Sequence, residues 1–113
     1  MTHIVRLTDY RAHVSRRNGR VYFSRTELSR ILSVYSVRVA CGEWRDYAID
    51  HTVGMALFSI FRHASEQPAF TVVKSLGGRG VEYSVFDATG RIGRSSDLKS
   101  ALTALPPPLS LVQ

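Results

Sequence analysis

The residue types best suited to chemistry lie in one block, GEWRDYAID, which runs from Gly42 to Asp50. Asp46 and Asp50 could act as general acids or bases together with His51 or His63. Acid–base catalysis needs two groups held together in a pocket, and alternation along a strand places Asp50 and His51 on opposite faces of a sheet. The sequence therefore predicts no catalytic residues, and we expect a protein that is not an enzyme.

Two other interpretations of this block stay open. In the structural one, Arg45 pairs with a carboxylate such as Glu66 and Trp44 closes the end of the core, so that a polar network fixes the register of the strands. In the other, exposed tryptophan, tyrosine and arginine side chains anchor a protein interface, as these residue types often do. The candidate protein-interaction residues are Trp44, Arg45, Tyr47 and Arg62.

No metal or cofactor site is predicted. The histidines lack metal-ligand spacing, and a single cysteine can form neither a thiolate metal site nor a disulfide within one chain. The glycine-rich loop from Gly77 to Gly80 has the composition of a phosphate-binding loop. Such loops precede a helix, however, and here the strand-like segment VEYSVFDA follows. We expect a hairpin turn at this loop and no cofactor.

The positive charge of the chain is concentrated at its start. Residues 1–25 contain six arginines against the single Asp9, a net charge of +5, whereas the other 88 residues contain nine basic and eight acidic groups, a net charge of +1. Guanidinium groups pair well with phosphates, and the binding releases counterions from nucleic acid. The candidate nucleic-acid-binding residues are Arg6, Arg11, Arg16, Arg17, Arg20 and Arg25.

Residues 1–20 are predicted to form a basic arm or a hairpin. A turn at Asn18 and Gly19 would gather Arg16, Arg17 and Arg20 into one positive patch. Without that turn, the same residues are a flexible arm or only a solubilising tail. In the hairpin, Val21 and Phe23 would enter the core just before the first helix.

The main helix is predicted from about residue 25 to about residue 41. Ser24 followed by Glu27 is a capping box, which marks a helix start, and Gly42 is a natural stop after the last turn. Apolar residues recur between them at the spacing of one helical face: Leu28, Ile31, Leu32, Tyr35 and Val39.

Beyond Gly42 the period changes from 3.6 to 2, which indicates strands. We expect an antiparallel meander of four or five strands from about 44 to 94, with the segment 55–62 central because both of its faces are apolar. A short helix from about 96 to 105, capped by Ser95 or Ser96, should cover the same face as the first. The fold class is therefore α+β, with a single domain over 21–105 and a proline-rich tail over 106–113.

The length of 113 residues suits one domain with its own core. The chain has no run of 18 apolar residues for a membrane span and no apolar stretch of the signal-peptide type near its start. We therefore expect a cytoplasmic protein that does not associate with membranes.

Three segments, GEWRDYAID, FSIFRHASEQP and EYSVF, resemble a family of short bacterial proteins, chiefly alphaproteobacterial, catalogued as a domain of unknown function. The resemblance covers roughly residues 21–105 and implies no reaction, cofactor or substrate. Members of that family usually have several basic residues between the third and fourth strands, where this chain has Arg79 alone. A binding role of that loop would be weakened here or moved to the N-terminal arm.

Two functions follow as hypotheses. The first is a small non-enzymatic binding module that contacts nucleic acid or a nucleoprotein assembly through the arginines of residues 1–25. The alternative is a protein–protein adaptor or a homodimer that uses the surface around Trp44 and Tyr47 and an open edge of the sheet, because an open edge can pair with another chain.

Overall fold

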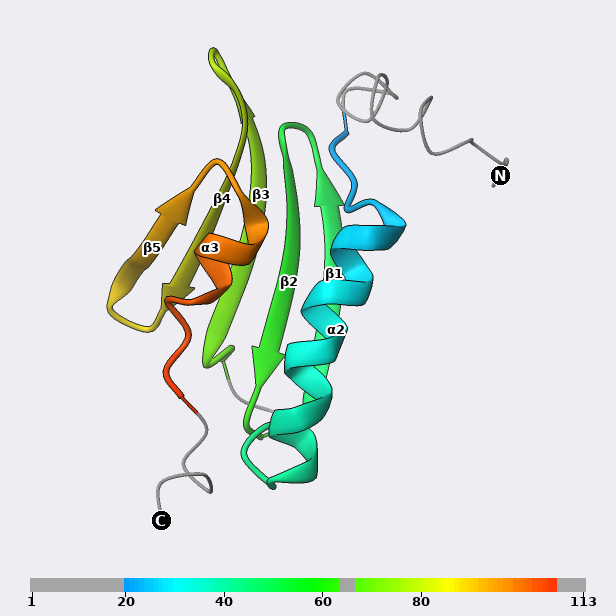
Figure 1. The fold of residues 1–113 in the computed structure, drawn as a ribbon, viewed down its shortest axis with the longest axis vertical. Helices are drawn as coiled ribbons and strands as arrows, with labels where there is room; N and C mark the ends of the chain where they lie inside the picture. The colour runs from blue at the N-terminus through cyan, green and yellow to red at the C-terminus, as the bar shows by residue number, and fades with distance from the viewer. Residues whose placement is uncertain (1–19, 64–66, 108–113) are drawn as a thin grey trace.

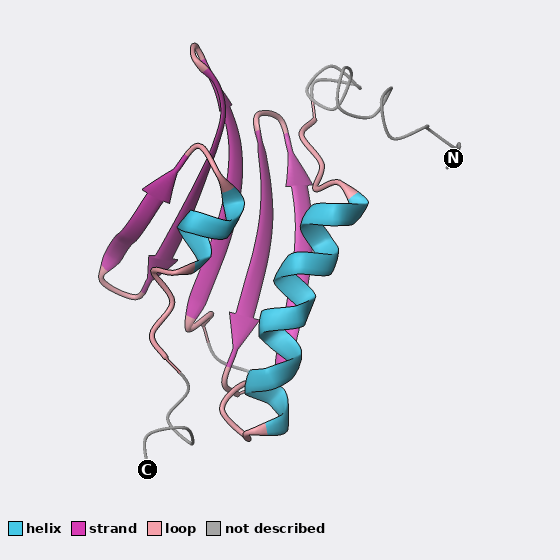
Figure 2. Ribbon diagram, viewed as in Figure 1, coloured by secondary structure: helices cyan, strands magenta, loops and turns pink. Residues whose placement is uncertain are grey.

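Two helices cover one face of a five-stranded antiparallel sheet (Figure 1). The computed structural model describes residues 20–63 and 67–107. The elements are α2 (Arg25–Ala40), β1 (Asp46–Thr52), β2 (Met55–Phe61), β3 (Phe70–Gly77), β4 (Gly80–Asp87), β5 (Gly90–Ser95) and α3 (Leu98–Leu102). Each strand pairs with the next along the chain, so the sheet is a meander. The predicted α+β class, the meander and the placement of both helices on one face are confirmed (Figure 2).

Helix α2 begins and ends as its sequence predicts. The Ser24 hydroxyl accepts a hydrogen bond from the Glu27 N–H at 3.1 Å, and the Glu27 carboxylate accepts one from the Ser24 N–H at 2.7 Å. At the other end, Gly42 has a φ of +80°, in the left-handed region that favours glycine. Three residues of α2 are buried, Ile31, Tyr35 and Arg38.

The core lies between the two helices and the sheet. Val21 and Phe23 are 1% and 4% exposed, so their predicted entry into the core is confirmed. The largest fully buried side chains are Trp44, Phe58, Ile31, Ile60, Val21, Val72 and Val85. They come from the segment before α2, from α2, from the loop after it and from the middle strands, so burial of this core holds all the layers together.

Two predicted boundaries differ from those observed. The first strand begins at Asp46 rather than near residue 44, because Trp44 turns into the core. The last helix begins later than predicted because its cap is Asp97, whose carboxylate accepts a hydrogen bond from the Ser100 N–H at 2.9 Å, and it ends at Leu102 rather than near residue 105. Serine and aspartate are both good caps, so composition alone could not choose between them.

Strand β2 was predicted to be central, but the central strand is β3. The residues of β2 that face the helices, among them Phe58 and Ile60, are buried. Its other face carries Leu57, which is half-buried, and Met55, which is 40% exposed. Both faces of β2 are apolar because the face of the sheet away from the helices also keeps apolar side chains.

The described part of the chain contains no helix with the length and apolar character needed to cross a bilayer.

Candidate interaction surface

The predicted nucleic-acid-binding arginines are only partly within the described residues. Arg6, Arg11, Arg16 and Arg17 lie outside them, as does the predicted turn at Asn18 and Gly19. Arg20 and Arg25 are exposed and lie at the end of the domain where residues 1–19 attach (Figure 1). The Arg20 guanidinium donates a hydrogen bond to the His51 carbonyl at 3.2 Å.

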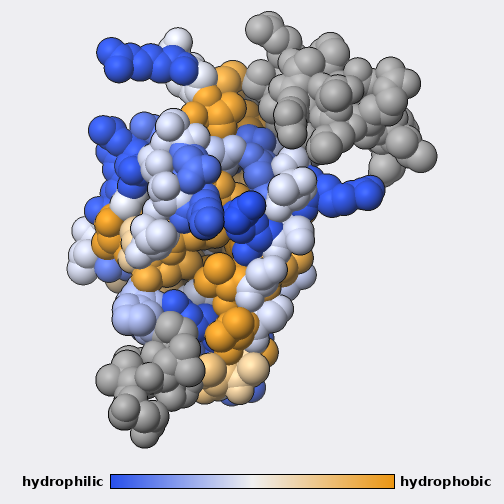
Figure 3. Space-filling model, in the orientation of Figure 1, coloured by the Kyte–Doolittle hydropathy of each residue, from blue (hydrophilic) through white to orange (hydrophobic). Residues whose placement is uncertain are grey.

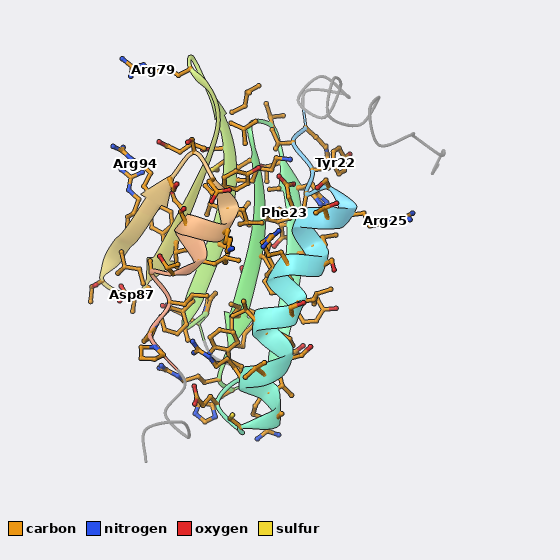
Figure 4. The ribbon with its side chains drawn as sticks, in the orientation of Figure 1. Tyr22, Phe23, Arg25, Arg79, Asp87 and Arg94 are labelled. Carbon is orange, nitrogen blue, oxygen red and sulfur yellow. The ribbon has the colours of Figure 1, made fainter. Side chains whose placement is uncertain are left out.

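Other arginines of the body do not extend this positive region into one patch. Arg79 lies in the turn between β3 and β4, and Arg94 lies on β5. Figure 4 shows Arg25 extending to the right from α2, whereas Arg79 and Arg94 extend to the left from the other side of the molecule. Arg94 also forms an ion pair with Glu82 at 3.3 Å. These three side chains therefore provide no joint phosphate-binding surface.

Trp44 is 2% exposed, so the interpretation that makes it an exposed interface anchor is wrong for this residue. Its indole closes the end of the core, as the structural interpretation proposed. The Arg38 guanidinium lies 4.8 Å from the centre of the Trp44 ring, pairs with Glu43 at 3.5 Å and donates to the Pro106 carbonyl. The predicted ion pair of Arg45 with a carboxylate such as Glu66 stays a prediction, because Glu66 lies outside the described residues.

Arg45, Tyr47 and Arg62 lie near one end of the β1–β2 pair. The Arg45 N–H donates to the Phe61 carbonyl at 2.8 Å, which places Arg45 beside Arg62. Both arginines are exposed. Tyr47 is 39% exposed, and its ring stacks on that of Phe58 at 4.9 Å. The roles of these three residues in protein interaction stay a prediction.

Strand β1 forms an outer edge of the sheet. Its last residue meets the segment before α2, because the Val21 N–H donates to the Thr52 carbonyl at 3.3 Å. Backbone groups of alternate residues point to the same side of a strand. The Gly54 and Ile60 carbonyls point to the β3 side and the Phe61 carbonyl points to β1, so Asp46, Ala48 and Asp50 pair with β2. Tyr47, Ile49 and His51 direct their backbone groups outward, where the His51 carbonyl accepts from Arg20. Within the described residues, no segment pairs with 46–50 on this side. This five-residue stretch is called the open edge below.

The open edge is apolar on one face of the sheet and acidic on the other. Tyr47 and Ile49 face the helices, where Leu28 and Leu32 of α2 are half-buried. A hollow of about 580 Å³ runs along this flank of α2, lined by Arg25, Leu28, Ser29, Leu32, Ser33 and Ser36. On the opposite face, the carboxylates of Asp46 and Asp50 are exposed.

The helix side offers no single large apolar surface. Figure 3 shows hydrophilic side chains across its middle, between hydrophobic patches above and below. A second hollow on this side, of about 540 Å³, lies between α2 and α3 and is lined by Arg30, Ser33, Val34, Lys99 and Leu102 among others. Its mixed lining does not single out a ligand.

A buried polar cluster of Glu27, Lys74 and Tyr83 was not predicted. The Lys74 ammonium lies 2.8 Å from the Glu27 carboxylate and 2.7 Å from the Tyr22 carbonyl, and the Tyr83 hydroxyl donates to Glu27. Burial by itself raises the pKa of Glu27, but hydrogen bonds from Lys74, Tyr83 and Ser24 and the charge of Lys74 outweigh it, so the pKa is lowered. The available signal was one lysine on the apolar, helix-facing side of FTVVKSLG.

This cluster joins α2 to the sheet and has no open pocket against it among the cavities described above. Every buried polar side-chain atom in the described residues has a hydrogen-bond partner. In the same residues, no three histidine, cysteine, aspartate or glutamate side chains gather to hold a metal ion. The open edge is therefore the feature best suited to binding.

The sequence from residue 21 to residue 102 matches the model of a family described as "Protein of unknown function (DUF2794)". No curated protein and no solved structure matches the chain. The match covers well over half of the 113 residues, so the chain belongs to this family. The bacterial range of the family and its sequence pattern stay predictions.

Proposed function

We propose that this member of the DUF2794 family is a small binding module that adds an extended segment of a protein partner to its open edge. One observation carries the proposal: the backbone groups of Tyr47 and Ile49 face away from β2 and meet no other described segment, apart from a hydrogen bond of the Tyr47 N–H to the adjacent Asp46 carboxylate. Free N–H and C=O groups in a row form a template for a further strand. Main-chain hydrogen bonds give such complexes affinity, and side-chain pockets give them specificity.

The side chains beside the open edge define the partner. Residues directly opposite one another in an antiparallel pair share a face of the sheet. Lysine or arginine opposite Asp46 and Asp50 would be favourable, and apolar side chains opposite Tyr47 and Ile49 would reach the hollow along α2. The expected partner segment therefore alternates basic and apolar residues.

A second copy of β1 suits this edge poorly. Antiparallel pairing of two copies centred on Ala48 would place Asp46 of each copy opposite Asp50 of the other. Like charges directly opposite each other destabilise a strand pair. The acidic side chains of β1 thus favour a different, basic segment over self-pairing at this register.

Ile49→Pro tests the open edge directly. Proline removes the N–H of residue 49, which points outward, and leaves the hydrogen bonds between β1 and β2 in place. A fluorescent peptide of alternating lysine and valine should bind the wild-type protein and the Ile49→Ala control, which keeps this N–H. Fluorescence anisotropy should show weaker binding to Ile49→Pro than to Ile49→Ala by about tenfold or more.

Circular dichroism must show that Ile49→Pro and Ile49→Ala stay folded. The same peptide with glutamate in place of lysine should bind poorly, because it would meet Asp46 and Asp50 with like charge. Equal binding of the lysine peptide by the proline variant, or no binding by any variant, would refute the proposed edge function.

A second candidate function is contact with nucleic acid or a nucleoprotein assembly through residues 1–25. The supporting observation is the net charge of +5 on this segment beside +1 on the rest. Arg20 and Arg25 are exposed at the end of the domain that bears the segment. Arginines that neutralise phosphates give an affinity that falls steeply with salt.

Four Arg→Gln substitutions, at residues 6, 11, 16 and 17, test this candidate. Binding of mixed DNA and RNA oligonucleotides, followed by anisotropy at two salt concentrations, should weaken strongly in this variant. A charge-matched control replaces Arg30, Arg45, Arg62 and Arg79 by glutamine and should retain most of the binding. Equal losses in both variants would show only a general charge effect, and salt-independent binding would exclude the phosphate contact.

A further inference from the structure

The face of the sheet away from the helices, called the open face here, has a segregated charge pattern. Strand register places directly opposite residues on the same face. One row across all five strands consists of Asp50, Leu57, Val73, Ser84 and Arg94. It has a carboxylate on β1, apolar and small residues on the middle strands, and a guanidinium on β5.

The neighbouring positions repeat the pattern. The next row consists of Ala48, Ser59, Thr71, Phe86 and Arg91. Beyond it, Asp46 lies opposite Phe61. The β1 side of the open face is therefore acidic and the β5 side is basic. Apolar side chains and small serine and threonine side chains lie between them, together with Glu82 of β4, which pairs with Arg94.

The middle of the open face is hollow. Val73 and Ser84 are 7% and 4% exposed although no described helix covers this face. Side chains on β2, β3 and β4, together with Arg91, surround a shallow cavity of about 400 Å³. Low exposure at its floor, with half-buried Leu57 and Phe86 at its sides, leaves apolar surface available for a further layer.

We propose that the open face is the contact surface of a homodimer, in which two sheets stack about a two-fold axis parallel to the strands. Rotation about this axis places β1 of one copy across from β5 of the other, and β3 on β3. Asp46 and Asp50 of each copy then face the arginines of β5 in the other. Both edges of the interface are complementary at once, as an isologous contact requires.

The charge layout favours this arrangement over the other ways of covering the face. A two-fold axis in the interface plane but perpendicular to the strands would place β1 on β1 and β5 on β5, so that like charges meet. A nucleic acid would meet the carboxylates of Asp46, Asp50 and Glu82 against the guanidinium groups of Arg91 and Arg94. The open face therefore suits a second copy better than a polyanion.

The size of the face is sufficient for a weak dimer. Five strands of six to eight residues, at about 4.8 Å between strands and about 3.3 Å per residue, give a planar footprint of roughly 500 Å² per copy. Two such faces bury about 1,000 Å² in total, near the lower limit for a specific interface. Stacked sheets lie about 10 Å apart with nearly aligned strands, which this axis allows.

Sedimentation velocity of the full chain over a concentration series tests the dimer. Asp50→Arg alone and Arg91→Glu alone should each raise the dimer dissociation constant by about tenfold or more, because each places like charges across the interface. The combined variant should return to within about threefold of the wild-type constant, since the reversed charges again meet. Arg91 lies one row from Asp50 in this arrangement and donates a hydrogen bond to the Ser84 hydroxyl at 3.4 Å. Arg94, in the row of Asp50, is not used because its reversal would also break the pair with Glu82 in its own chain.

A second pair of variants separates the interface from general effects. Leu57→Lys, on the open face, should abolish dimerisation. Val37→Lys, at a position of α2 that is 49% exposed, should leave the dissociation constant unchanged. Circular dichroism checks that each variant is folded.

A wild-type protein that stays monomeric at every concentration would overturn the proposal. So would a dimer that neither charge reversal weakens, or one that the combined variant does not restore. A dimer weakened by Ile49→Pro and not by Leu57→Lys would instead pair through the open edge. Failure of the dimer leaves the backbone pairing at the open edge untouched, because that pairing uses main-chain groups of β1, although both proposals also use the carboxylates of Asp46 and Asp50.

Discussion

Several polar contacts converge on Glu27. It completes the capping box with Ser24, and its carboxylate accepts hydrogen bonds from Lys74 and Tyr83. The side chains of Glu27 and Lys74 are 16% and 4% exposed. Removal of one partner from a buried pair destabilises a protein far more than loss of a surface pair.

We expect Glu27→Gln to lower the free energy of unfolding by about 2–4 kcal/mol, because the carboxylate that Lys74 pairs with is lost. Glu82→Gln is the matched control. It removes a carboxylate from the pair with Arg94, whose side chains are 42% and 57% exposed, and should cost at most about 0.5 kcal/mol. Urea unfolding at neutral pH measures both, and equal losses would contradict a special role for Glu27.

The pH dependence of the difference in unfolding free energy between the wild type and Glu27→Gln gives a second check. The pKa of Glu27 lies below its ordinary value of 4.5 in the folded protein. Its contribution is therefore complete above about pH 4.5, where the unfolded chain is also ionised, and is lost as the pH falls through the folded pKa. The gap between wild type and Glu27→Gln should shrink in urea titrations below about pH 4.5. A constant gap would show that charge is not the cause.

At this scale the sequence reveals residue types better than their environments. The capping box follows from Ser24 and Glu27 alone, because it is local. The burial of Trp44 and the pairing of Arg38 depend on how the chain turns after α2, which composition does not specify. Lys74 and Glu27 are 47 residues apart, so their contact needs the tertiary fold.

At the scale of the elements, the docking of α3 depends on a glycine, which has no side chain. Gly93 of β5 lies against the turn after α3, where an added Cβ would overlap the Ala104 methyl group. Glycine at this position lets the short C-terminal helix approach the sheet closely. The buried residues of α3, Leu98, Ala101 and Leu102, depend on that approach.

Gly93→Ala should therefore destabilise the protein by about 1–3 kcal/mol through overpacking. Gly78→Ala is the control, because no atom lies within 4 Å of the Cβ it would add. Combining Gly93→Ala with Ala104→Gly should recover part of the loss by removing the opposing methyl group. Thermal unfolding compares the variants, and similar melting temperatures for both single alanine variants would contradict the close approach.

The elements themselves could be predicted because their signals are local. Alternation located the strands, and short turns between them indicated a meander. The close contact at Gly93 could not be predicted, since a glycine in a strand has many explanations. The central position of β3 could not be predicted either. Strand β2 has apolar residues on both of its faces, one of which belongs to the open face, so its sequence resembles that of a central strand.

At the scale of the whole molecule, the two layers divide the surface into unlike regions. The helix side carries separate hydrophobic patches, while the far side of the sheet runs from acidic at β1 to basic at β5. Charge totals from the sequence correctly show a nearly neutral body after residue 25. They cannot show that opposite charges are sorted to opposite edges, because that sorting arises from strand order and register.

Membership in the DUF2794 family does not choose between these surfaces, since its description gives no function. The open edge and the open face can be tested separately. Backbone groups of Ile49 serve the first, and side chains such as Leu57 serve the second. Asp46 and Asp50 are shared by both proposals, so variants of these two residues do not distinguish them.

The shared carboxylate of Glu27 has a consequence for how the fold opens. First turns of helices usually fray, because few contacts beyond the local ones hold them. Here the capping glutamate is also held by residues 47 and 56 positions further along the chain. The start of α2 cannot unwind while these contacts persist, so it should open together with the middle of the sheet rather than ahead of it.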